Sequence, residues 1–154
     1  MKKWIMGLAL LAVVVYEGMP FSPTDIASLQ PVEVIRLSRQ ETWMIQTDTG
    51  DQGQGGTVEE AFLDLKDHCP GKVFLDTADY LIVTAEALPM PEEIYDYLRP
   101  SCAVCLERGE AVVAEAAAFL AVHKPEVSLG DYRAGGVQLP VLISWEGSME
   151  LGSQ

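Results

Sequence analysis

Residues 57–83 read TVEEAFLDLKDHCPGKVFLDTADYLIV, a segment in which a helix pattern is followed at once by two strand patterns. Thr57 and Glu60 have the T-x-x-E spacing of a capping box, which marks the start of a helix. Apolar residues then recur at intervals of three and four, as on one buried helix face: Val58, Ala61, Phe62, Leu65 and Cys69. Pro70-Gly71 ends the pattern. The segment therefore predicts a helix that leads into a sheet.

Further strand and helix patterns extend from this segment in both directions. Strands are predicted at 32–37, 43–45, 72–75, 80–83, 101–107 and 137–145, and helices at 57–69, 91–99 and 111–122. Residues 50–56, which are rich in glycine, and residues 130–136 are predicted as loops. Strands that alternate with helices are typical of a sheet with helices packed against it. We expect one α/β (α+β) domain with a mixed β-sheet and about three helices.

The N-terminus has the charge order of an export signal. Lys2 and Lys3 precede the uncharged run Trp4–Tyr16, and no small-x-small cleavage site follows. We therefore expect an uncleaved, apolar signal-anchor helix, with the lysines inside the cell and the body of the protein on the extracytoplasmic side. The expected organisation is a signal-anchor segment at 1–21, a tether at 22–31, an α/β domain at 32–146 and a polar tail at 147–154.

The chain is strongly acidic, with a formal net charge of −13. Such a protein repels the phosphates of nucleic acids and the head groups of anionic lipids. We therefore expect no nucleic acid partner, and contact with the membrane through residues 4–16 alone. The charge is suited to a cationic surface on a partner protein.

Cys102 and Cys105 match the C-x-x-C spacing of redox proteins. In those proteins the first thiol lies at a helix N-terminus, where the helix dipole lowers its pKa. Here both cysteines lie inside a strand pattern, where residues three apart point to opposite faces of a sheet. We interpret them as buried packing residues and keep a redox protein as an alternative. We expect no metal site, because Cys69, His68 and His123 do not complete a tetrahedral ligand set.

Two acidic triplets resemble those of aspartic proteases, in which two carboxylates share a proton. They are Asp48-Thr49-Gly50 and Asp76-Thr77-Ala78. The second triplet follows an apolar strand, as in the proteases, but alanine replaces the glycine, and protease lobes are almost entirely β. We interpret Asp48 as the start of the glycine-rich loop and Asp76 as the end of a strand. An exported enzyme built on Asp48 and Asp76 remains the other alternative.

The glycine-rich residues 50–56 precede a helix, as phosphate-binding loops do. They lack the Gly-Lys-Ser/Thr of a P-loop, and Val58 takes the place of the last glycine of a dinucleotide fingerprint. His68 and His123 are interpreted as residues at helix C-termini, where a positive charge suits the helix dipole. We therefore expect no catalytic residue and no cofactor.

Five segments follow one another in an order that is typical of a known domain: Gly53–Ala61, Cys69–Leu75, Tyr80–Ala87, Tyr97–Pro100 and Ala103–Ala111. They contain a Gly-x-Gly turn before a helix, a proline-containing break, and strands of which the last ends in a turn of small residues. In order and character, residues 53–110 resemble the N-terminal domain of the Ger(x)C family, the C subunits of spore germinant receptors.

The resemblance implies a non-enzymatic subunit that works beside polytopic membrane proteins during spore germination. Members of the family are longer lipoproteins with an N-terminal cysteine, whereas the first cysteine here is Cys69. We expect a stand-alone relative of the first domain, anchored by its own apolar helix. The leading hypothesis is a membrane-tethered interaction or scaffold protein with a germinant-receptor-like membrane protein as its partner.

Overall fold

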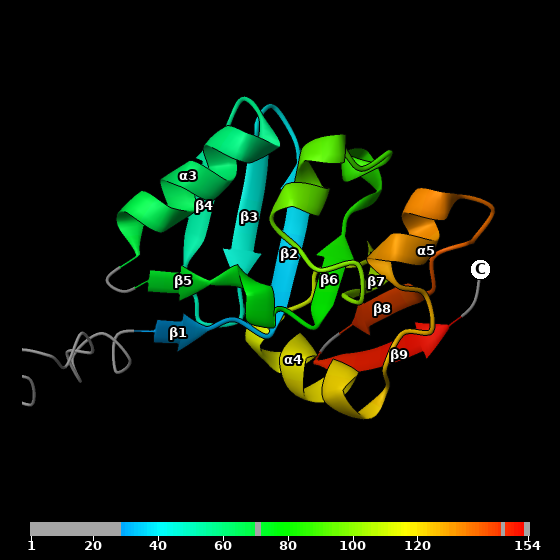
Figure 1. The fold of residues 1–154 in the computed structure, drawn as a ribbon. Coiled ribbons are helices and arrows are strands. Elements are labelled where there is room, and N and C mark those ends of the chain that lie inside the picture. The colour runs from blue at the N-terminus through cyan, green and yellow to red at the C-terminus, as the bar shows by residue number, and fades with distance from the viewer. Residues whose placement is uncertain (1–28, 70–71, 146, 153–154) are drawn as a thin grey trace, which may run out of the picture.

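The computed structural model describes residues 29–69, 72–145 and 147–152 (Figure 1). The strands are β1 (Leu29–Pro31), β2 (Val34–Arg39), β3 (Trp43–Thr47), β4 (Gln52–Gly55), β5 (Lys72–Phe74), β6 (Tyr80–Val83), β7 (Ala103–Arg108), β8 (Val141–Trp145) and β9 (Ser148–Gly152). The α-helices are α3 (Val58–His68), α4 (Val113–Val122) and α5 (Leu129–Ala134), and three 3₁₀ segments are η1 (Leu75–Thr77), η2 (Ala85–Ala87) and η3 (Glu92–Asp96).

Seven strands form one mixed sheet in the order β4-β3-β2-β6-β7-β8-β9. β2, β6, β7 and β8 are parallel neighbours, while β3, β4 and β9 extend the two sides in antiparallel pairings. β1 and β5 form a separate parallel pair. The predicted fold class, a single α/β domain with a mixed sheet, is confirmed.

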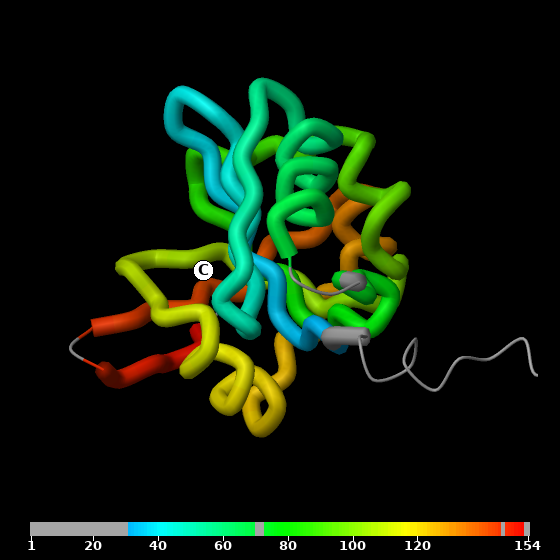
Figure 2. Tube along the Cα trace, turned by 90° about the vertical axis from the view of Figure 1, so that its left-hand side faces the viewer, coloured from blue at the N-terminus to red at the C-terminus, as the bar shows by residue number. Residues whose placement is uncertain are grey.

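Alternate residues of the central strands enter two separate hydrophobic clusters. Ile35 and Leu81 belong to the cluster under α3, η3 and α5, and we call this side the covered face. Val34 and Ile82 belong to the cluster under α4, which forms the half-open face. Figure 2 shows α3, the 3₁₀ segments and α5 gathered on one side of the sheet. The half-open face therefore carries a single helix among the described residues.

The start of α3 follows the sequence prediction. The hydroxyl of Thr57 accepts a hydrogen bond from the backbone N–H of Glu60 at 3.1 Å. The Glu60 carboxylate accepts from the N–H of Gly56 at 2.8 Å, one residue before the position that a capping box uses. The helix ends before Pro70, with Cys69 as its C-terminal cap. Local sequence therefore determines both ends of this helix.

The glycine-rich loop predicted at 50–56 is wrong over most of its length, because residues 52–55 form β4. β4 pairs with β3, and α3 packs directly on it. A Cβ atom at Gly53 would collide with the carbonyl oxygen of Ala61 and the backbone of Leu65. The glycines allow a helix to approach a strand at backbone distance, which is a packing role and not the role of a flexible loop.

The loop predicted at 130–136 is also wrong, because most of it belongs to α5. Ser128 and Asp131 form a complete capping box, in which each side chain accepts a hydrogen bond from the other residue's backbone N–H. Gly135, with a φ of 84°, ends the helix. The aspartate in the third position forms the box that glutamate usually forms.

The folded domain extends beyond its predicted bounds at both ends. The polar tail predicted at 147–154 contains β9, in which Met149 and Leu151 alternate with polar residues and pack on the α4 cluster. The tether predicted at 22–31 ends in β1, which pairs with β5. The last predicted strand begins at Val141 and not at residue 137, and the helix predicted at 91–99 is the shorter 3₁₀ segment η3.

The predicted signal-anchor at 1–21 lies outside the described residues. None of the helices within the described ranges combines the length and apolar character needed to cross a bilayer. The anchor therefore stays a prediction from the sequence.

Candidate functional site: a polar cleft on the half-open face

A cleft of about 870 Å³ opens on the half-open face, at the carboxyl ends of β2, β6 and β7. Its lining residues come from β2, β3 and β7 and from the segments that follow β2, β6 and β7: Arg36, Ser38, Arg39, Gln40, Glu41, Thr42, Met44, Gln46, Thr84, Ala85, Glu86, Glu107, Gly109 and Glu110. In open α/β sheets, ligands bind outside the carboxyl ends of the parallel strands. The position alone makes this cleft the candidate site.

The floor of the cleft is a buried ion pair between Arg36 and Glu107. Arg36 Nε lies 2.8 Å from Glu107 Oε2, and only 1% of the Glu107 side chain is exposed. The other carboxylate oxygen accepts a hydrogen bond from the N–H of Ala111 at 2.8 Å. Arg36 Nη1 donates to Gln46 Oε1 at 3.0 Å. The pair is therefore held by one further hydrogen bond on each side, from Arg36 to Gln46 in β3 and from Ala111 to Glu107.

Sheet register places these residues on one face. Arg36 is paired with Gln46 on one side and with Ile82 on the other, and Ile82 is paired with Cys105. Glu107 follows Cys105 by two residues in β7, so it points to the same face. Arg36 and Glu107 thus meet across β6. α4 contacts the amino-terminal half of this face, so the carboxyl half stays polar.

Three further carboxylates line the cleft, at Glu41, Glu86 and Glu110. All three are exposed, and none takes part in an ion pair among the described residues. The guanidinium of Arg39 lies 4.9 Å from the ring centre of Trp43, whose side chain belongs to the cluster of the covered face. The rim of the cleft is therefore acidic, whereas the charges of Arg36 and Glu107 on its floor neutralise each other.

This arrangement is suited to non-covalent binding. Both oxygens of Glu107 already accept hydrogen bonds from the protein, so the carboxylate is held in place beside Arg36. Carboxylates on the rim attract cationic groups, and Met44, with 36% of its surface exposed, offers an apolar contact on the same face. The cleft can therefore hold a cationic, partly apolar group by charge and contact.

The cysteines are placed as the sequence predicted. Cys102 belongs to the cluster of the covered face and Cys105 to the cluster of the half-open face, and both are fully buried. Burial raises the pKa of each thiol to about 12. Cys69 is partly exposed, and burial, together with the nearby Asp51, raises its pKa to about 11. Cys102 and Cys105 therefore do not form a dithiol pair.

The two aspartates of the protease-like triplets have separate environments. Asp48 Oδ1 accepts hydrogen bonds from the backbone N–H groups of Glu33 and Val34, at 3.2 and 3.3 Å. Asp76 lies exposed in η1. Among the described residues, no hydrogen bond joins Asp48 to Asp76. Asp48 orders the entry to β2, which is a structural role.

Both histidines lie at helix C-termini, as predicted. The Nδ1 atom of His68 lies 2.9 Å from the carbonyl oxygen of Asp64 and 3.0 Å from its carboxylate. The backbone hydrogen bond and the negative charge of Asp64 raise the pKa of His68. The ring of His123 lies 4.6 Å from that of Phe119, one helical turn earlier. Neither histidine lines the cleft.

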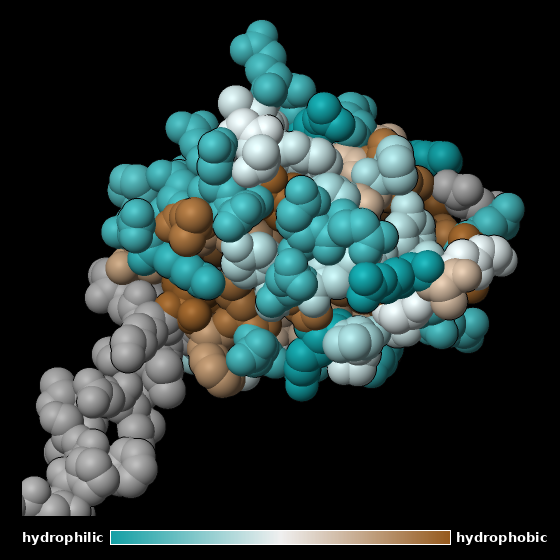
Figure 3. Space-filling view, turned by 45° about the horizontal axis from the view of Figure 1, so that its top comes forward, coloured by the Kyte–Doolittle hydropathy of each residue, from teal (hydrophilic) through white to brown (hydrophobic). Residues whose placement is uncertain are grey.

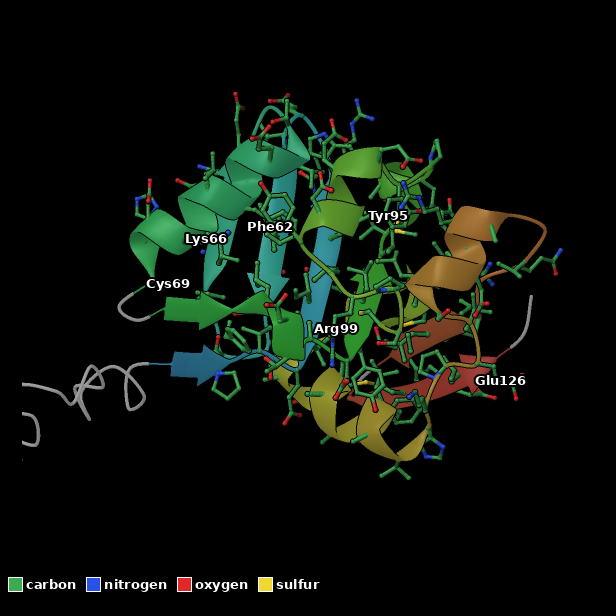
Figure 4. All side chains as sticks on the ribbon, viewed as in Figure 1. Phe62, Lys66, Cys69, Tyr95, Arg99 and Glu126 are labelled. Atoms are coloured by element: carbon green, nitrogen blue, oxygen red, sulfur yellow. The ribbon has the colours of Figure 1, made fainter. Side chains whose placement is uncertain are left out.

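The opposite side of the molecule has a different character. On the covered face, Phe62 stacks on Tyr97 with ring centres 4.1 Å apart, and the Lys66 ammonium lies 5.1 Å from the Tyr97 ring. Phe62 and Lys66 both belong to α3 and are labelled in Figure 4. In Figure 3 apolar residues gather on the side of α3 and β5, where Leu63 and Phe74 are 50% and 43% exposed. This apolar surface is separate from the polar cleft.

Arg36, Gln46 and Glu107 were not singled out by the sequence, although a signal was present. Arg36 stands in the middle of an apolar strand pattern, and Glu107 ends another. Opposite charges at two positions that a strand pattern buries indicate an ion pair, because an unpaired buried charge is costly.

Comparisons with protein-family models, with curated proteins and with solved structures found no match to this chain. Within the described ranges, no group of three or more histidine, cysteine or acidic side chains could hold a metal ion.

Proposed function

We propose that this protein is a non-enzymatic interaction or scaffold protein, tethered to the membrane by residues 4–16 and similar to the N-terminal domain of a germinant-receptor C subunit. Its body lies on the extracytoplasmic side of a spore-forming bacterium. Its partner is a membrane protein of the germination apparatus.

The packing of α3 on β4 gives a physical reason for the Gly-x-Gly pattern with which the proposed resemblance begins. The first matching segment contains Gly53 and Gly55, and at both positions an added Cβ would collide with the backbone of α3. These glycines are required by the fold, so the Gly-x-Gly pattern is more than a local turn preference. The resemblance thus begins at a position where the sequence is physically constrained.

The cleft supports a binding role. In its ion pair, Arg36 donates a hydrogen bond to Gln46 and Glu107 accepts one from Ala111, and the rim of the cleft carries exposed carboxylates. An acidic surface that is supported by a hydrogen-bonded ion pair favours association with a basic partner, because little conformational entropy is lost on docking.

Fractionation and crosslinking of sporulating cells test the proposal. Full-length tagged protein is expected in the membrane pellet, and crosslinking is expected to capture polytopic germination proteins. The matched control is the double variant Leu10→Arg/Val13→Arg, which places two charges in the apolar run and should release the chain from the pellet. If the wild-type chain is found in the soluble cytoplasmic fraction, the proposed membrane tether is contradicted. If the protein is expressed only during vegetative growth, the proposed role in germination is contradicted.

A further inference from the structure

We propose that the polar cleft is the docking site for an extended basic segment of a partner protein, which lies across the uncovered half of the sheet with its lysine or arginine side chains against Glu41, Glu86 and Glu110. This inference rests on the proposed function, since it names the surface and the chemistry of the partner.

The first reason is that a parallel part of the sheet lacks a cover. β2, β6 and β7 are parallel neighbours, and parallel strands in α/β proteins are normally covered by helices on both faces. Here α4 covers Val34, Ile82 and Cys105, while Arg36, Ser38 and Glu107, further along the same strands, line the cleft. The uncovered half has the position at which such sheets bind ligands.

The second reason is charge. The positive charge of Arg36 is matched by Glu107 at 2.8 Å, so the floor contributes little net charge. Glu41, Glu86 and Glu110 remain without an ion-pair partner in the described part of the chain, and only Arg39 opposes them from the lining. Exposed carboxylates that line one cleft are stabilised when a cation approaches them.

The third reason is the shape and polarity of the cleft, which favour a polypeptide segment. Sites for small organic ligands are mostly apolar and enclose the molecule, whereas this cleft is open and most of its lining residues are polar. A second copy of the chain is a poor occupant, because each copy carries a net charge of −13. An extended basic segment places alternate side chains on the rim and its apolar parts on Met44.

Thr84 adds a polar group that the protein itself does not use. Thr84 is one of the residues that line the cleft, and its Oγ1 atom is buried and has no hydrogen-bond partner among the described residues. A buried polar group gains stability when a partner is supplied.

The test uses the full chain in detergent micelles and a short capped peptide of alternating lysine and threonine as the probe. Peptide binding is expected to perturb the NMR signals of β2, of the residues after β6 and of residues 109–110. The triple variant Glu41→Gln/Glu86→Gln/Glu110→Gln should bind the peptide about ten-fold more weakly. The matched control Glu59→Gln/Asp67→Asn/Glu93→Gln removes the same charge from exposed positions elsewhere and should leave binding within about two-fold of the wild type.

Several outcomes would overturn the proposal. They are no binding of the peptide, equal weakening by the two triple variants, and equally tight binding of a peptide in which glutamate replaces lysine. Binding of spermidine as tight as that of the peptide would assign the cleft to small amines instead. If crosslinking still captures a membrane partner with the cleft triple variant, the proposed function stands and the cleft assignment fails.

Discussion

The two faces of the central sheet are built from the same strands and differ in what covers them. On the covered face, alternate residues such as Ile35, Leu37 and Leu81 are fully buried under α3, η3 and α5. On the half-open face, α4 buries one end of the strands, and the other end carries an ion pair and an acidic rim. Because neighbouring residues of a strand point to opposite faces, one strand can supply stability on one side and a binding surface on the other.

The comparison is most sharply tested at Phe62. This side chain is fully buried and stacked on Tyr97, so Phe62→Ala should lower the free energy of unfolding by about 4 kcal/mol. Phe119, on α4, is only partly buried, and Phe119→Ala should cost about half as much or less. Urea unfolding of the full chain measures both. Equal losses in the free energy of unfolding would mean that the two faces contribute equally to stability.

Gly53 tests how closely α3 packs on β4. The Gly53→Ala variant forces the backbone of α3 away from the strand, and we expect a loss of about 3 kcal/mol in the free energy of unfolding. Gly152 lies in β9 with no atom near the position of an added Cβ, so Gly152→Ala is the control and should change stability little. A tolerated Gly53→Ala would remove the packing explanation of the Gly-x-Gly pattern.

Arg36 tests the floor of the half-open face. Arg36→Met leaves the carboxylate of Glu107 buried without its counter-charge, and we expect a loss of about 3 kcal/mol in the free energy of unfolding. The double variant Arg36→Met/Glu107→Leu removes both charges and should recover part of that loss. A double variant less stable than Arg36→Met would show that Glu107 acts mainly through Ala111.

Cys102 and Cys105 allow the two faces to be compared through the smallest expected change in stability. Cys102→Ala and Cys105→Ala should each cost about 1 kcal/mol through lost burial, since one thiol lies on each face. In the folded protein Cys69 should react first with a thiol reagent, because Cys102 and Cys105 are inaccessible. Rapid labelling of Cys102 or Cys105 in the folded chain would contradict this assignment.

The thiols of Cys102 and Cys105 also predict that the stability of the fold falls at high pH. Burial raises the pKa of Cys102 and Cys105 from 9.0 to about 12, so the folded state favours the protonated thiols. Their contribution to stability is complete below pH 9 and is lost as the pH rises from 9 towards 12, where only the unfolded chain ionises readily. The variant with both cysteines changed to alanine should show a weaker decline over this range in pH-dependent unfolding.

The sequence determined the elements whose signals are local. The Thr57 cap, the apolar stripe of α3, the opposite placement of Cys102 and Cys105, and the α/β class all follow from spacing along the chain, because helix and strand periods fix which residues share a face. Tertiary structure decided the rest. Gly53 lies in a strand only because β3 and α3 contact it, and the cleft exists because register brings Arg36 and Glu107 together across β6. Such contacts join residues that are far apart in the sequence, and no local preference specifies them.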